Sequence, residues 1–368
     1  MGASCAAEPS GLAPYAQMCI ICRMAYRAAV LGGSGYLGAE VLRLLAGHPE
    51  IEVVHVTADA NVGAPVSSLF PSLGPAYPSL EYGALAPAAL DGLDFTFAAL
   101  PHGESQRVMP ELVSRVAHVV DLGADFRHPA DVYKEWYGEA HAVPELLSDF
   151  GYGLPELYRD ELAAVAHVAA PGCYPTTAGL ALAPLFAHGL AERTGVVVNA
   201  VSGVSGRGRG LSAPSLYSEA NENVQAYGLL DHRHTGEIEQ VLAKAAGDAV
   251  QVLFTPHLVP MTRGILATCY ARSATQGLST AKLLDVYREH YADEPFVAVT
   301  EGSPATKATL GSNSCHVTVR FDDRTGTLLA LGALDNLVKG GSGQGIQAAN
   351  VLLGLPETTG LSTIGLMP

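Results

Sequence analysis

One cysteine, Cys173, lies in a setting that could make its thiol reactive. It occurs in the glycine- and proline-containing segment APGCYPT, and the apolar run AGLALAPLFAHGL follows at residues 178–190. The Pro-Thr-Thr sequence just after the cysteine is typical of a helix start, so Cys173 is expected in the connection just ahead of a helix N-terminus. The positive end of a helix stabilises a thiolate and lowers the cysteine pKa from its free value of about 8.5. We therefore predict a nucleophile here, with a buried structural cysteine as the alternative.

Two histidines in one short segment could handle protons for that nucleophile. His232 and His234 lie in DHRHTGE, where Thr235 has the character of a helix cap and Glu237 belongs to the first helical turn. Histidine titrates near neutral pH, which suits general acid–base catalysis. The alternatives are a surface turn or a zinc site with Cys173, but the sequence offers no evident fourth ligand. We therefore predict no metal.

A glycine-spaced turn far from Cys173 could bind a dinucleotide. The segment GGSGYLG follows the short apolar run 27–31 and precedes apolar residues at helical spacing up to Gly47. In such a strand–turn–helix unit the glycines permit a tight turn and the close approach of a pyrophosphate to the helix N-terminus. A glycine-rich turn without a ligand is the alternative. The predicted cofactor contacts are Gly32, Ser34, Gly35, Tyr36, Leu37 and Gly38.

The segments after this turn predict a doubly wound parallel sheet. Strands are expected at 51–57, 94–100, 118–121 and 162–170, and a helix is expected at 178–190, with a break at Pro184. Asp59 follows the second strand, where an acidic residue would bond the ribose hydroxyls of NAD. It could equally be a loop-capping aspartate. No arginine occurs from Ala58 to Leu80 to receive the additional phosphate of NADP.

Composition agrees with a soluble enzyme of two domains. The chain has 368 residues, of which 48% are hydrophobic and 15% charged, and its net charge of -15 argues against nucleic acid or an anionic membrane as partner. No apolar stretch has the length of a spanning helix. Six cysteines in a chain this long do not indicate a disulfide framework. Residues 1–24, which include the Cys19–Cys22 pair, are predicted to be a disordered extension.

These segments resemble the N-acetyl-gamma-glutamyl-phosphate reductase family of arginine biosynthesis from about Tyr26 to the C-terminus. The resemblance rests on GGSGYLGAEVLRLLAGHP, ALPHG, DLGADFR, YGLPEL, APGCYPT, SGVSGRGR, HRHTGE, FTPHLVPMTRGILAT and DNLVKG, in that order. It implies an NADPH-dependent oxidoreductase that converts N-acetyl-L-glutamyl 5-phosphate to N-acetyl-L-glutamate 5-semialdehyde and phosphate through a cysteine thioester. It also implies a cytoplasmic homodimer or homotetramer.

The resemblance further implies an α/β fold shared with aspartate-semialdehyde and glyceraldehyde-phosphate dehydrogenases. A Rossmann-type dinucleotide-binding domain is expected at 25–170, completed by the C-terminal segment 335–368, whose last helix, at about 342–353, packs back on this domain. A catalytic and oligomerisation domain of α+β type with a mixed sheet is expected at 171–334.

Several site residues follow from the substrate and the resemblance. His232 takes the acid–base role by resemblance, with His234 as the second candidate, and Glu237 either orients a histidine, binds substrate or only favours the helix start. A substrate with a phosphate and a carboxylate should meet arginines, and the candidates are Arg127, Arg209 and Arg263, each of which could instead be a surface residue. The remaining predicted cofactor contacts are His102 at a strand's carboxyl end, Ser202 and Gly203 in the glycine-rich segment 202–210, and Asn336 beside the 340–343 loop.

Other functions stay open at this point. A reductase of the same fold could act on aspartyl phosphate or on a longer acylated amino-acid phosphate of lysine synthesis. From another class, the chain could be a non-catalytic dinucleotide-sensing module. Asp59 also conflicts with an NADPH preference, because its charge would repel a 2′-phosphate if it faces the ribose.

Overall fold

The computed structural model describes residues 25–367 and contains two sheets. The first is a six-stranded parallel sheet in the order β2-β1-β3-β4-β6-β5. Its strands are β1 (Tyr26–Leu31), β2 (Ile51–Val56), β3 (Phe95–Ala98), β4 (His118–Asp121), β5 (Phe150–Tyr152) and β6 (His167–Ala169). The helices around it are α1 (Tyr36–Leu45), α2 (Val66–Leu69), α3 (Glu104–Leu112), α4 (Ala130–Tyr137) and α5 (Pro155–Leu162). The predicted parallel α/β arrangement is therefore confirmed.

The predicted strand at 162–170 is wrong over its first half. Leu162 ends helix α5, and only His167–Ala169 forms β6. The alanine-rich stretch between them has little β propensity, and an apolar run of this length does not distinguish a helix end from a strand.

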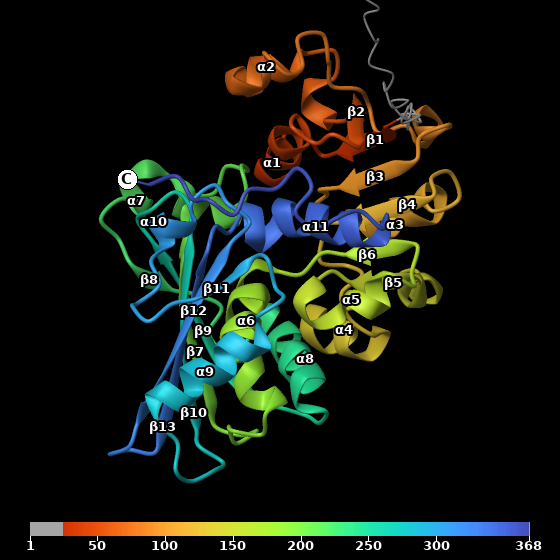
Figure 1. Ribbon diagram of the computed structural model, residues 1–368. Helices are drawn as coiled ribbons and strands as arrows, with labels where there is room; N and C mark the ends of the chain where they lie inside the picture. Colours follow the sequence, from red (N-terminus) through yellow and green to blue (C-terminus); the bar gives the residue numbers. More distant parts are fainter. Residues whose placement is uncertain (1–24, 368) are drawn as a thin grey trace, which may run out of the picture.

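The second sheet is mixed and has seven strands in the order β11-β12-β13-β10-β7-β9-β8. Its strands are β7 (Val196–Gly203), β8 (Gln225–Ala226), β9 (Val252–Val259), β10 (Ile265–Arg272), β11 (Val297–Val299), β12 (Cys315–Asp322) and β13 (Thr327–Leu334). Its helices are α6 (Cys173–Ala187), α7 (Tyr217–Ala220), α8 (His234–Ala246), α9 (Thr280–His290) and α10 (Thr306–Thr309). Figure 1 shows α6 and α9 packed on one side of this sheet. This mixed sheet agrees with the expected α+β domain.

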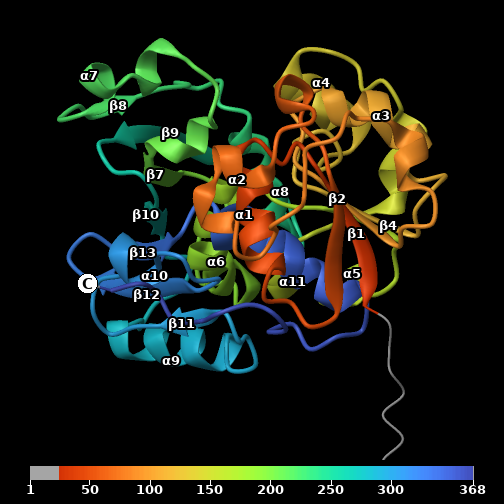
Figure 2. The ribbon, with the colours of Figure 1, turned by 90° about the horizontal axis from the view of Figure 1, so that it is seen from above.

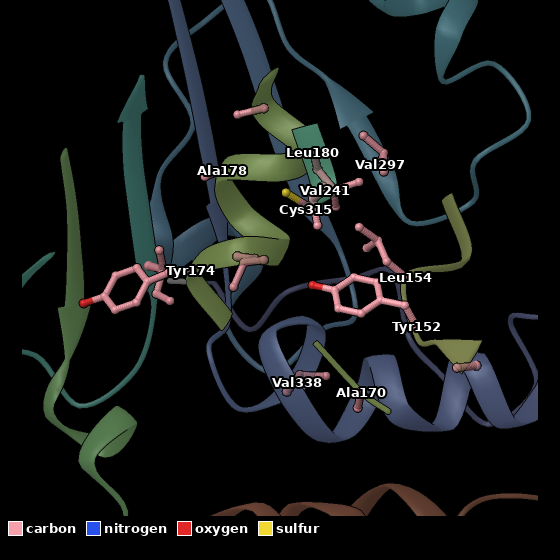
Figure 3. Packing of buried hydrophobic residues seen from close by; sticks show 14 of the residues in the cluster. Tyr152, Leu154, Ala170, Tyr174, Ala178, Leu180, Val241, Val297, Cys315 and Val338 are labelled. Atoms are coloured by element: carbon pink, nitrogen blue, oxygen red, sulfur yellow. The ribbon is translucent and has the colours of Figure 1, made fainter. Parts of the chain in front are cut away.

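Helix α6 is apolar on every side and lies inside the protein. Nearly all of its residues are buried, and Figure 3 shows Ala178 and Leu180 packed with Val241 of α8 and Cys315 of β12. The helix begins at Cys173 itself, earlier than predicted, and it continues through Pro184 without the expected break. Proline lacks the N–H that would bond the carbonyl four residues before it. Here the hydroxyl of Tyr291 donates to that carbonyl, on Leu180, at 2.5 Å, so this buried carbonyl has a hydrogen-bond partner.

The C-terminal segment returns to the first sheet. A π-helical turn (Val338–Ser342) leads into α11 (Gly343–Leu352), as the predicted helix at 342–353 required. Helix α11 lies between α1 and α5 and also contacts β4 and β6 (Figures 1 and 2). The chain therefore crosses twice between the two sheets, and these crossings bring segments from both to one place. The predicted N-terminal extension lies outside the described residues.

Candidate active site

The glycine turn after β1 is too tightly packed to hold side chains at two positions. Gly32 has φ +75°, and a Cβ there would lie 2.3 Å from the carbonyl oxygen of Ala99. A Cβ on Gly38 would lie 2.4 Å from the carbonyl oxygen of Gly32, so helix α1 can approach the turn only with glycine there. Gly35, Tyr36 and Leu37 then present the N-terminus of α1 to a cavity. This cradle fits the phosphates of a dinucleotide.

That cavity lies between the two sheets and has a volume of about 570 Å³. It is lined by the loops after β1 and β3, by the start of α6, by the segment after β7, by the start of α8 and by the π-helical turn before α11. Nine of the residues predicted to form the site line this cavity, and they belong to loops and helices around both sheets. They are Gly35, Tyr36, Leu37, His102, Arg127, Cys173, Arg209, His234 and Asn336.

Cys173 is the first residue of α6 and is held closely from two sides. A Cβ on Gly340 of the π-helical turn would lie 2.8 Å from the Cβ of Cys173. Burial raises the pKa of the thiol to about 11, and Arg127 together with the backbone N–H groups at the helix start only partly opposes this. The expected lowering of the pKa is therefore wrong for the ligand-free protein, because the loss of solvation outweighs the helix end.

Glu237 organises the backbone beside Cys173 and does not line the cavity. Its Oε1 accepts hydrogen bonds from the N–H of Gly172 at 2.7 Å and from the hydroxyl of Tyr152 at 2.8 Å. Its Oε2 accepts from Nη1 of Arg127 at 3.2 Å. Burial opposes its ionisation, but Arg127 and the other neighbouring groups outweigh this and lower the pKa of Glu237 to about 2. The carboxylate thus joins the cysteine turn to the arginine.

The two histidines occupy different places. His234 is the first residue of α8 and lines the cavity, and a Cβ on Gly172 would lie 2.6 Å from its Nε2. His232 lies behind it, where its Nδ1 accepts a hydrogen bond from the N–H of His234 at 3.1 Å and its ring packs against Tyr174, Tyr227 and Phe254. Burial lowers the pKa of His232 to about 4 and that of His234 to about 3. Both imidazoles are therefore neutral at pH 7, and it is His234 that the structure brings beside the cysteine.

Thr235 does not cap α8. It is the second residue of that helix, and the residue before the helix is Arg233. The helix therefore starts at the histidine rather than after it: Arg233 already has helical φ and ψ angles, and the imidazole of His232 accepts the N–H of His234.

The three predicted arginines are separated. Arg127 is buried, with Nη2 donating to the carbonyl of Leu122 at 3.2 Å, and its Nε has no hydrogen-bond partner among the described residues. Arg209 reaches the nucleotide turn, where Nη1 donates to the carbonyl of Ser34 at 3.4 Å. Arg263 does not line the cavity, because it pairs with Glu40 and Asp335 instead.

Of the remaining predicted cofactor contacts, two line the cavity and two do not. His102 lines the cavity and its Nδ1 lies 2.6 Å from Oδ1 of Asp125, a carboxylate with no exposed surface. Asn336 lines the cavity while its side chain bonds the N–H of Gly264 and the hydroxyl of Ser205. Ser202 and Gly203 are buried in the end of β7 and do not line it.

Within residues 25–367, no three His, Cys, Asp or Glu side chains are placed to hold a metal ion. In the same part of the chain, no helix combines the length and apolar character needed to cross a membrane.

Comparison with known proteins agrees with this geometry. The family described as semialdehyde dehydrogenase, NAD binding domain, matches residues 27–165, and the one described as semialdehyde dehydrogenase, dimerisation domain, matches residues 173–336. The N-acetyl-gamma-glutamyl-phosphate reductase of Symbiobacterium thermophilum is 45% identical over 93% of this chain and 99% of its own. That of Desulforudis audaxviator is 47% identical over 92% of this chain and 99% of its own. The chain belongs to the N-acetyl-gamma-glutamyl-phosphate reductase family.

Solved structures show the same fold at low sequence identity. Aspartate semialdehyde dehydrogenase II from Vibrio cholerae, complexed with ASA, has a TM-score of 0.70 at 14% identity and covers 90% of this chain and 98% of its own. Aspartate semialdehyde dehydrogenase with NADP from Candida albicans has a TM-score of 0.67 at 17% identity, with 89% and 98% covered. The expected fold relationship is thus confirmed.

Several cavity residues of this N-acetyl-gamma-glutamyl-phosphate reductase family member were missed by the sequence reasoning. They are Leu122, Ser205, Arg207 and Arg233, and Asp125 behind them orients His102. Arg233 stands between the two histidines that were singled out, so its position in HRHTGE was the available signal. Asp125 had a signal too, since it lies in the same DLGADFR segment as Arg127.

Proposed function

We propose that this chain is an oxidoreductase that uses NADPH to convert N-acetyl-L-glutamyl 5-phosphate to N-acetyl-L-glutamate 5-semialdehyde and phosphate in arginine biosynthesis. The observation that carries the proposal is that Cys173, the imidazole of His234 and the nucleotide turn line one cavity. Relatives of nearly the same length carry the name of this reaction.

In the proposed mechanism, Cys173 and His234 act as a neutral pair. Because the thiol pKa is raised to about 11 and the imidazole pKa is lowered to about 3, the proton stays on sulfur until attack begins. The sulfur then bonds to the acyl carbon, Nε2 of His234 takes the thiol proton, and the carbon–oxygen bond to phosphate breaks. The product is a thioester on Cys173.

The second half of the reaction returns that proton. The glycine turn and the start of α1 would hold NADPH, which would supply the hydride. The protonated His234 donates to the oxygen of the former carbonyl, which gives a thiohemiacetal on Cys173. When the carbon–sulfur bond breaks, the same imidazole takes the proton back from that oxygen, the aldehyde leaves, and the proton returns to the sulfur.

Arg127 and Glu237 position the reacting groups. Glu237 fixes the N–H of Gly172 and compensates the charge of Arg127, so the turn that carries the thiol keeps its place. Because Arg127 also lines the cavity, we assign its guanidinium to an oxygen of the substrate. We assign Arg263 to the ion pairs with Glu40 and Asp335 rather than to substrate.

We further propose a cytoplasmic homo-oligomer, a dimer or tetramer, built on the mixed sheet. Helices cover one face of this sheet, while the other face of β9 and β10 carries Leu253 and Tyr270, which are 49% and 38% exposed. The matching family is described as a dimerisation domain, and an apolar sheet face of this kind suits a second copy of the chain. Sedimentation equilibrium of the purified protein measures the state directly.

The decisive experiment runs the reaction backwards with wild type and Cys173→Ser. We expect phosphate-dependent reduction of NADP by N-acetylglutamate semialdehyde with the wild type, and its loss in the variant, because serine is scarcely ionised near neutral pH and is a far poorer nucleophile. Cofactor binding, followed by fluorescence titration, should be retained in the variant.

Three outcomes would overturn the proposal. Turnover of aspartate semialdehyde in preference would assign the aspartyl substrate, and turnover of a longer acylated semialdehyde would assign the lysine-type substrate. Absence of any turnover, together with tight dinucleotide binding, would indicate a sensing module.

Cys315→Ser is a matched control for the loss of a thiol, since that cysteine is buried in β12.

A further inference from the structure

The nucleotide end of the cavity lacks a cation in the place where the fold would normally supply one. A 2′-phosphate on the adenosine ribose is received by an arginine near the end of the second strand. Residues 58–80, which follow β2, contain neither arginine nor lysine, and Asp59 is exposed there. A chain that prefers NADPH must therefore bring the positive charge from elsewhere.

Arg209 supplies a positive charge at that position from the other half of the molecule. It follows β7 by six residues, yet its Nη1 donates to the carbonyl of Ser34 in the nucleotide turn. Its guanidinium also lies 5.8 Å from the ring centroid of Phe70, within cation–π range. Phe70 belongs to the segment after β2, so Arg209 sits between the glycine turn and the part of the fold that borders the ribose.

A third neighbour supports this placement. Tyr82 contacts the turn through its hydroxyl, which lies 3.5 Å from the carbonyl oxygen of Gly33. Burial raises the pKa of Tyr82, and the positive charge of Arg209 opposes that rise. The exposed guanidinium of Arg209 therefore contacts both the glycine turn, at Ser34, and the segment after β2, at Phe70, and the buried Tyr82 lies within range of its charge.

Three other arginines of this region are already paired with carboxylates, and Arg207 and Arg233, which also line the cavity, lie over the rings of Tyr227 and Tyr137. Arg43 of α1 and Arg263 both bond Glu40, and Arg263 also reaches Asp335. Arg127 pairs with Glu237 at the cysteine end. Within residues 25–367, Arg209 makes a long bond to a carbonyl and a ring contact, and neither of these neutralises its charge.

We propose that Arg209 is the residue that receives the 2′-phosphate of NADPH and so determines cofactor specificity. The inference rests on the proposed use of NADPH, and it moves Arg209 from the substrate to the cofactor. A guanidinium matches the oxygens of a phosphate monoester bidentately. The selectivity for the phosphate then depends on both halves of the molecule, because neither the turn alone nor the segment after β7 alone forms the pocket.

The test measures binding rather than turnover. Calorimetric titration with 2′,5′-ADP and with 5′-AMP compares the wild type, Arg209→Ala and Arg209→Lys. We expect Arg209→Ala to bind 2′,5′-ADP roughly 10- to 100-fold more weakly, the range of a hydrogen-bonded charge, with 5′-AMP binding unchanged. Arg209→Lys should recover part of the lost affinity for 2′,5′-ADP, because lysine keeps the positive charge but cannot form the bidentate hydrogen bonds of a guanidinium.

Arg207→Ala is the matched control. Arg207 lies two residues away in the same glycine-rich segment, but its guanidinium lies over the ring of Tyr227, 5.1 Å from the centroid. The ratio of the two affinities should stay at the wild-type value in this variant.

Other outcomes overturn the inference and are distinct from failure of the proposed reaction. Equal weakening of 2′,5′-ADP and 5′-AMP in Arg209→Ala would place the arginine on the phosphate that both ligands share. Unchanged binding of both, with a raised KM for the acyl phosphate, would return it to the substrate. If the wild type binds both ligands equally well, the 2′-phosphate has no receptor in this chain, whichever reaction it catalyses.

Discussion

The cysteine end and the nucleotide end of the cavity are built in different ways. Around Cys173 the charged groups are enclosed and paired: Glu237 has no exposed surface on its side chain, and it holds Arg127, Tyr152 and the N–H of Gly172. At the nucleotide end Asp59 and Arg209 are exposed. Enclosed pairs fix the reacting atoms at the cost of desolvation, whereas exposed charges discriminate between ligands and leave the fold unaffected. In the proposed assignment the reacting groups are therefore preorganised, whereas the choice of cofactor depends on exposed charges.

The largest expected effect comes from neutralising Glu237. Glu237→Gln leaves the guanidinium of Arg127 enclosed without a counter-charge, so we expect a loss of about 3–5 kcal/mol in the free energy of unfolding. Urea denaturation followed by circular dichroism measures it. Glu161→Gln is the control at the exposed pair with Lys244, where the loss should stay below about 1 kcal/mol.

Glu237→Gln should also change how the free energy of unfolding depends on pH. The pKa of Glu237 is lowered in the folded protein to about 2, so its stabilisation is complete above the unfolded value of about 4.5 and is lost as the pH falls towards 2. The Gln variant should lack this part of the acid dependence. Equal stability of the two proteins at pH 7 would show that the cysteine end is not held by this carboxylate.

A smaller effect concerns the reactivity of the thiol. With a pKa of about 11, Cys173 in the ligand-free protein should react with iodoacetamide at pH 7.5 roughly 100-fold more slowly than a free thiol. Peptide mass spectrometry separates this residue from the other cysteines, and the rate should keep rising up to pH 10 and beyond. An inflection below pH 8.5 would show that the helix end and Arg127 lower the thiol pKa by more than burial raises it. The nucleophile would then be a thiolate that is already formed in the ligand-free protein.

This contrast also explains what the sequence could predict. The glycine turn, the parallel strands and the place of Cys173 at a helix start were accessible because each depends on local spacing, and turn glycines such as Gly32 are required by backbone geometry. The motifs of the family then gave the fold and the reaction. The helix through Pro184 was not accessible, because its continuity depends on the hydroxyl of Tyr291, far away in the sequence.

Within the site, tertiary contacts decided what local patterns left open. His232 and His234 are two residues apart, and only the three-dimensional arrangement puts one at the cavity and the other behind it. The guanidinium of Arg263 could bind an anionic substrate, but in the structure it pairs with Glu40 on α1. The direction of the thiol pKa was wrong because the helix start is a local feature, whereas burial is set by the whole fold.

The smallest expected effect lies at the nucleotide end. Asp59 starts the 3-10 turn after β2 (Asp59–Asn61) and is exposed, so water and salt screen its charge from a bound 2′-phosphate. Asp59→Asn should therefore strengthen the binding of 2′,5′-ADP by at most roughly fivefold, and 5′-AMP binding should stay the same. The gain should shrink in 0.5 M salt. A change of more than tenfold, or weaker binding of 5′-AMP, would mean that Asp59 bonds the ribose directly; the nucleotide end would then be as firmly preorganised as the cysteine end, and the contrast between them would fail.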